Sequence, residues 1–74
     1  MKKYKVFLSV NRNKEDKLVF ESEEEKFARG FINNVTCYLE PFDDRYHDEE
    51  DKGRYYIMNG IEPIYFSESY EIPT

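Results

Sequence analysis

The stretch from Ser22 to Pro41 restricts the fold of this chain more than any other, because its apolar residues recur at the spacing of one helix face. At 100° per residue, these apolar side chains fall within an arc of roughly 140°; they are Phe27, Ala28, Phe31, Ile32, Val35, Tyr38 and Leu39. Ser22 is the expected N-cap, since Glu25 follows it three residues later as in a capping box. We therefore predict one amphipathic helix, with one face on a sheet and the other in water.

Strand patterns precede this helix. Residues 4–10 alternate between apolar and mostly polar side chains, which is typical of a strand with one apolar face. Phe7 interrupts the polar side, which indicates that this second face is partly covered. After a polar loop over residues 11–17, residues 18–20 form a short second strand, so the two strands make a hairpin with a long loop.

A second hairpin is predicted after the helix, in residues 53–72. Asn59-Gly60 is the strongest short turn signal, because both residues tolerate the positive φ that a tight hairpin turn needs. Pro63 complicates this hairpin, since it has no N–H to give where the pairing would require one. Three alternatives remain: a longer loop, a bulge that shifts the register, or an edge strand with Pro63 facing outward.

These elements predict a small α+β domain. Residues 1–74 form one domain, a two-layer sandwich in the order β-β-α-β-β, with one amphipathic helix on an antiparallel sheet. A chain of this length buries only about 60% of the surface that its unfolded form exposes. Seven Tyr and six Phe residues compensate for the small core, because each ring buries a large area. A deep catalytic pocket is not expected.

Charge and cysteine content restrict the partners. The net charge is -5, and it is uneven: residues 1–17 hold six basic and two acidic side chains, whereas residues 18–74 hold fourteen acidic and five basic ones. An acidic majority disfavours nucleic acid or an anionic membrane as a direct ligand. Cys37 is the single cysteine, which favours a reducing, cytoplasmic setting. No stretch has the length of a transmembrane helix.

Metal and catalytic sites are not expected either. A calcium loop that began at Asp48 would need an oxygen ligand where Lys52 stands. Zinc would need more ligands than His47 and Cys37 supply. Neither residue has a recognisable partner for nucleophilic chemistry, and paired carboxylates need a water-poor pocket for acid–base work. We therefore predict a protein that is not an enzyme and has no metal or other cofactor.

The remaining candidate site is the acidic run within residues 43–51, joined by the glutamates at the start of the predicted helix. Aromatic residues are interleaved with these acids, and that composition is typical of protein interfaces. The partner-binding residues that we predict are Asp43, Asp44, Tyr46, Asp48, Glu49, Glu50, Asp51, Tyr56, Glu23, Glu24 and Glu25. The simplest alternative is a solvated loop that keeps the protein soluble.

With its segments SEEEKF, EPFDDRY and HDEEDKGRYY, the chain resembles the small, acidic, tyrosine-rich α+β proteins that bacteriophages make early in infection. The resemblance implies a cytoplasmic inhibitor of a basic, nucleic-acid-binding host protein, such as a histone-like nucleoid protein or a DNA-acting enzyme. The acidic side chains would imitate DNA phosphates. Tyr46 and Tyr56 would be anchors whose hydroxyls bond to Lys or Arg.

Two further functions fit the same residues. One is a protein–protein blocker in which a tyrosine-rich patch makes the contact and the acids only steer the encounter. The other is a small intracellular domain whose acids serve solubility and which has no mimic role. An exposed strand edge, either at Pro63 or at the first strand, also predicts that a homodimer can form.

Overall fold

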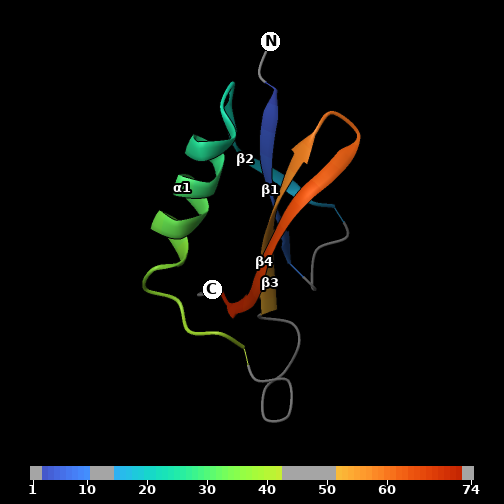
Figure 1. Cartoon of the computed structure of the whole chain (residues 1–74). Helices are drawn as coiled ribbons and strands as arrows, with labels where there is room; N and C mark the ends of the chain where they lie inside the picture. The colour runs from blue at the N-terminus through green and yellow to red at the C-terminus, as the bar shows by residue number, and fades with distance from the viewer. Residues whose placement is uncertain (1–2, 11–14, 43–51, 73–74) are drawn as a thin grey trace.

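The computed structural model of this chain describes residues 3–10, 15–42 and 52–72. Four antiparallel strands form one sheet in the order β2-β1-β3-β4, and helix α1 lies on one face of that sheet (Figure 1). The elements are β1 (Tyr4–Val10), β2 (Lys17–Ser22), α1 (Glu25–Thr36), β3 (Lys52–Asn59) and β4 (Glu62–Glu71). The predicted α+β sandwich with the order β-β-α-β-β is confirmed.

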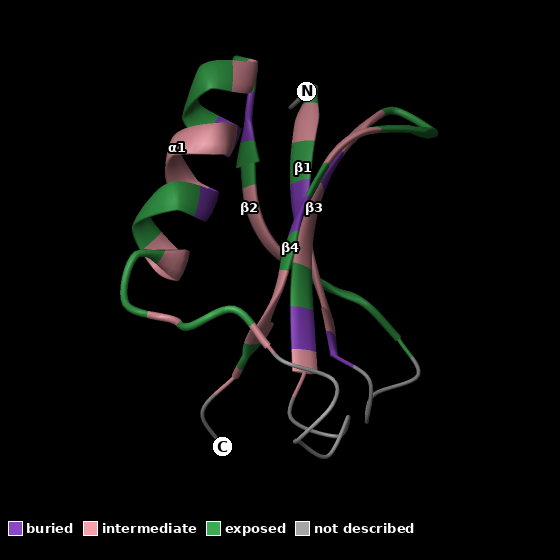
Figure 2. Ribbon diagram, turned by 60° about the horizontal axis from the view of Figure 1, so that its bottom comes forward, coloured by how far each residue is buried: buried purple, intermediate pink, exposed green. Residues whose placement is uncertain are grey.

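The core lies between α1 and the two central strands (Figure 2). Val6 of β1, Ile57 of β3, and Ala28 and Ile32 of α1 are fully buried there. A ring of partly buried apolar side chains surrounds them: Tyr4, Val19, Phe20, Phe31, Tyr55, Ile64 and Tyr65. The aromatic residues therefore supply much of the apolar area that this short chain can bury.

A bulge in β2 explains how this edge strand feeds the core. Val6 pairs with Phe20 and Phe7 pairs with Leu18, so Val19 has no partner of its own on β1. A bulge of this kind turns two consecutive side chains toward the same face. Val19 and Phe20 accordingly both pack against the core, and the ring of Phe20 stacks on Phe31 of α1 at 4.7 Å between centroids.

The start of α1 differs from the sequence-based expectation. The helix begins at Glu25, and its N-cap Glu24 is extended and makes no side-chain cap. Ser22 is instead the buried last residue of β2, where its hydroxyl accepts a hydrogen bond from the Glu24 N–H at 3.2 Å. The predicted capping box is therefore wrong, because Ser22 lies three residues before the first residue of the helix and uses its oxygen for the turn between β2 and α1.

The helix also ends earlier than its apolar pattern suggests. Thr36 is its last residue, and its hydroxyl donates to the carbonyl of Ile32 at 2.7 Å. Tyr38 therefore leaves the predicted apolar stripe, and 94% of its surface is exposed. The chain then runs beside the end of β4, where the Phe42 N–H donates to the Ser69 carbonyl at 2.9 Å.

The hairpin of β3 and β4 resolves the problem posed by Pro63. The two turn residues are Gly60 and Ile61, one position later than predicted, and they lie between the paired residues Asn59 and Glu62. Gly60 has a φ of 67°, and only this first turn residue takes a positive φ, as in a type II′ turn. Pro63 then falls in the next pair, opposite Met58, where a strand N–H points away from its neighbour. Because β4 is an edge strand, the missing N–H leaves no gap in the sheet.

Candidate functional site: the uncovered face of the sheet

The face of the sheet opposite α1, here called the uncovered face, carries three aromatic rings in a row. Phe7 of β1 lies opposite Tyr56 of β3, and Tyr56 lies opposite Phe66 of β4. The ring centroids are 5.4 Å apart for Phe7 and Tyr56 and 5.8 Å apart for Tyr56 and Phe66, with interplanar angles of 18° and 29°. These three residues are the aromatic row.

Leu18 extends this row onto the fourth strand, because it pairs with Phe7 across β1 and β2. The row is accessible from solvent: 55% of Phe66 and 43% of Leu18 are exposed. An antiparallel sheet with one face in water normally carries polar side chains on that face. A line of apolar side chains across all four strands departs from that pattern and indicates a contact surface.

The orientation of the rings decides what this surface can bind. Near-parallel rings on adjacent strands turn their faces toward one another, so their edges face the solvent. A single-stranded nucleic acid needs free ring faces on which its bases can stack. The aromatic row offers such a face only at its ends, and it therefore suits the apolar side chains of a protein better than nucleotide bases.

A hydrogen bond holds the middle ring of the row in place. The Tyr56 hydroxyl donates to the carboxylate of Asp16, which lies just before β2. Burial, this hydrogen bond and the charge of Asp16 together raise the pKa of Tyr56 to about 12. The hydroxyl that the sequence suggested as a hydrogen-bond partner for Lys or Arg is thus already held by Asp16 within the chain.

Charged and polar side chains border the aromatic row on both sides. On one side Lys5 of β1 lies opposite Glu21 of β2. On the other side Arg54 of β3 lies opposite Ser69 of β4, and its guanidinium donates to the Ser69 hydroxyl at 3.2 Å. An apolar centre with a mixed polar border is the usual composition of a protein interface.

The acidic residues predicted from the sequence do not lie on this face as far as the structure describes them. Glu23 and Glu24 are exposed in the turn before α1, and Glu25 forms an ion pair with Arg29 at 2.7 Å. Seven further predicted residues lie outside the described residues: Asp43, Asp44, Tyr46, Asp48, Glu49, Glu50 and Asp51. Of the predicted set, Tyr56 alone is on the uncovered face within the described part of the chain.

The two acidic clusters are attached to opposite ends of the sheet. The turn with Glu23 follows Ser22, which pairs with Tyr4, and Tyr4 pairs with Asn59 at the end of β3. The acidic run connects Phe42 to Lys52 at the start of β3, and the Lys52 ammonium lies 5.2 Å from the centroid of the Phe42 ring. About six strand residues, or about 20 Å, separate the two ends.

Within the described ranges, no three His, Cys, Asp or Glu side chains are close enough together to hold a metal ion. Cys37 is exposed at the end of α1, where its thiol donates to the Asn34 carbonyl at 3.1 Å. No described helix is long and apolar enough to cross a bilayer.

The sequence contained one sign of the aromatic row, namely Phe7 on the polar side of the first strand. That observation suggested a covered face, but no described segment lies over it, and Phe7 instead packs on Tyr56 of the neighbouring strand. Phe66 and Leu18 gave no such sign, because their place beside Phe7 and Tyr56 depends on the strand register.

Comparison of the chain with protein-family models, curated proteins and solved structures found no match.

Proposed function

We propose that this chain is a non-enzymatic binding protein that occupies the surface of a basic partner protein with its uncovered face. The observation that carries the proposal is the line of apolar side chains from Leu18 to Phe66, on a sheet face where polar residues are usual. In this view the protein is a blocker: it denies the partner's surface to the partner's other ligands.

The packing of the aromatic row favours tight binding. Tyr56 is fixed between Phe7 and Phe66 by ring contacts on both sides and by its hydrogen bond to Asp16. Side chains that are already ordered lose little conformational entropy when they enter an interface. Aromatic residues and arginine are also the residues most enriched at binding hot spots, and Arg54 lies beside the row.

The charge of the chain indicates the class of partner. Acidic residues outnumber basic ones by five overall, so a basic partner would be attracted over long range and would associate faster. Proteins that bind nucleic acid present such basic surfaces. We place the encounter in the cytoplasm, since the single cysteine of the chain suits a reducing compartment.

A second candidate function is imitation of DNA by the acidic residues, as the resemblance to phage inhibitors implies. The excess of fourteen acidic over five basic side chains in residues 18–74 favours it, together with the exposure of Glu23 and Glu24. In this version, phosphate-like carboxylates make the contact, and the aromatic row has no part in binding.

Salt and two sets of variants separate the two candidates. Immobilised chain would be used to capture a partner from bacterial lysate, and the affinity of that partner would be measured at 50 and 500 mM NaCl. Binding through the aromatic row predicts weak salt dependence, a large loss with Phe66→Thr, and little change with the triple variant Asp48→Asn/Glu49→Gln/Glu50→Gln. Mimicry predicts a steep loss of affinity with salt, competition by duplex DNA, and loss with the triple variant. Because a blocker of a nucleic-acid-binding surface would also compete with duplex DNA, the deciding results are the salt dependence and the variants: loss of binding with the triple variant would overturn the proposed role of the row.

A further inference from the structure

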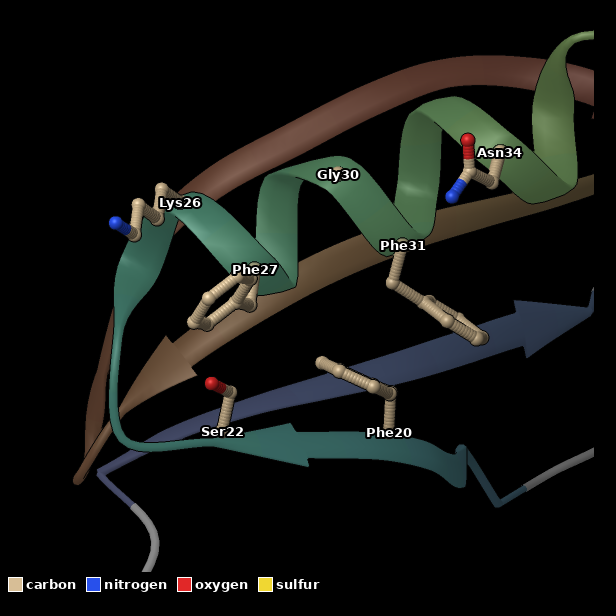
Figure 3. Close-up of a pocket in the computed structure, with 7 residues that line it drawn as sticks. All are labelled: Phe20, Ser22, Lys26, Phe27, Gly30, Phe31 and Asn34. Atoms are coloured by element: carbon tan, nitrogen blue, oxygen red, sulfur yellow. The ribbon is translucent and has the colours of Figure 1, made fainter.

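An apolar groove lies on the other side of the sheet, between α1 and the edge strand β2 (Figure 3). Its volume is about 350 Å³. Phe20 and Ser22 of β2 point into it from below, and Phe27 and Phe31 point into it from the helix above. Lys26, Gly30 and Asn34 complete its lining. The groove is at the small end of the usual range for binding sites, about 300–1,000 Å³, and matches one or two large side chains.

Gly30 lies on the helix wall of this groove. Its position on α1 lies between Lys26 and Asn34, one turn from each, and a Cβ added there would meet no atom within 4 Å. Gly in the interior of a helix costs about 1 kcal/mol relative to Ala. The packing of this fold does not require that cost, because a Cβ at Gly30 would meet no atom; a longer side chain at this position has free space into which it can extend along the groove.

Beside the groove, the backbone of β2 has an edge that no other described strand pairs with. Within the described part of the chain β2 pairs only with β1, and its ladder is regular along Phe20–Ser22, where consecutive residues pair with consecutive residues of β1. The other edge of the sheet is protected. β4 carries Pro63 and two register shifts, and residues 40–42 hydrogen-bond to its far end. Proteins commonly blunt their strand edges by such means, and the regular part of β2 lacks them.

Charge indicates what can pair with this edge. If a second copy paired its own Phe20–Ser22 segment antiparallel about a two-fold axis, Glu21 would face Glu21, and like charges directly opposite one another are destabilising. Glu21 is exposed and forms no ion pair within the described residues, although Lys5 lies opposite it on β1. A foreign strand with a basic residue opposite Glu21 satisfies that carboxylate.

We propose that β2 accepts an extended segment of a partner protein in which a basic side chain alternates with large apolar ones. The segment adds a fifth strand along Phe20–Ser22. Its basic side chain meets Glu21 on the uncovered face, and its apolar neighbours point to the helix side and enter the groove beneath Gly30. Strand addition supplies affinity through main-chain hydrogen bonds, and the pockets for alternate side chains supply specificity. This site is separate from the aromatic row and does not depend on the proposed role of that row.

Synthetic peptides test the proposal directly. The probe is a fluorescein-labelled heptapeptide of alternating phenylalanine or leucine and lysine, flanked by threonine. One control peptide has glutamate in place of lysine, and a second has the same composition with the apolar residues consecutive. Fluorescence anisotropy against the full chain gives the affinities. We expect the lysine peptide to bind at least tenfold more tightly than either control. Equal binding of all three peptides, or no binding, would overturn the proposal.

Two matched pairs of variants locate the site. Gly30→Leu places a side chain in the groove and raises helix propensity, so we expect a folded variant whose affinity for the lysine peptide is at least tenfold lower. Asn33→Leu adds the same side chain at an exposed helix position outside the groove, and it should change that affinity less than twofold. Glu21→Lys should reverse the preference between the lysine and glutamate peptides, whereas Glu62→Lys on β4 should not. Equal effects within either pair would refute the assignment. A dimer in sedimentation velocity that Gly30→Leu dissociates would show that a second copy occupies the groove, and would also refute it.

Discussion

The position of Tyr56 between two rings predicts a measurable energetic coupling across the uncovered face. Tyr56→Leu keeps an apolar side chain on β3 but removes both ring contacts and the hydrogen bond to Asp16. Each aromatic pair contributes about 0.5–1.5 kcal/mol beyond its buried area, and the hydrogen bond contributes about 1 kcal/mol. We therefore expect Tyr56→Leu to lower the free energy of unfolding by about 2–4 kcal/mol.

A double-mutant cycle isolates one of these contacts. Phe66→Leu alone loses a single ring contact and should cost about 1 kcal/mol, and the coupling energy between Tyr56→Leu and Phe66→Leu should be about 0.5–1.5 kcal/mol. Urea unfolding followed by far-UV circular dichroism measures each value. Because a domain of this size has only about 3–5 kcal/mol of stability, sucrose should be present to keep all variants folded.

A second cycle provides the control. Ile61 is 97% exposed in the turn of the β3–β4 hairpin. Ile61→Leu and Tyr56→Leu should therefore be additive within about 0.3 kcal/mol. If the Tyr56 and Phe66 substitutions are additive to the same degree, the rings do not support one another, and the account of a preorganised aromatic row is refuted.

Three further predictions concern single residues. The pKa of Tyr56 is raised to about 12, so between pH 10 and 12 the unfolded chain loses this proton while the folded chain keeps it. The free energy of unfolding should therefore fall over that window in the wild type and less steeply in Tyr56→Phe. Urea unfolding at pH 9 and pH 11 measures the difference. Gly53→Ala places a Cβ against the side chain of Ile72 and should cost about 1–3 kcal/mol in urea unfolding, whereas Gly30→Ala, whose Cβ meets nothing, should be neutral or stabilising. Ser22→Ala removes the acceptor of the Glu24 N–H and should lower the unfolding free energy by about 1 kcal/mol, measured in the same way; no loss would show that the turn before α1 does not need this bond.

The periodicity of the sequence was sufficient to predict the class and order of the elements. Apolar residues at helical spacing identified α1, and alternation in residues 4–10 identified β1, because burial of one face imposes those periods on any small two-layer domain. The ends of the elements were harder to predict. Ser22 has the sequence context of an N-cap, but the local hydrogen bond that it makes belongs to a turn, and both uses need the same residue type.

The aromatic row could not be predicted because it depends on strand register. Phe7, Tyr56 and Phe66 are far apart in the sequence, and they become neighbours only through the pairing of β1 with β3 and of β3 with β4. The β3–β4 pairing contains two shifts, one of which leaves Ile64 without a partner between Pro63 and Tyr65. A shift of one residue moves every later side chain to the other face, and no local pattern in this sequence marks where the shifts occur.

The most direct test of the central claim is to map the contact surface in solution. ¹⁵N-labelled chain would be titrated with the captured partner, and amide chemical-shift changes would be assigned along the sequence. Binding through the uncovered face predicts the largest changes at Phe7, Leu18, Tyr56 and Phe66. Changes confined to Glu23–Glu25 and the acidic run, with the aromatic row and Leu18 unaffected, would contradict the claim.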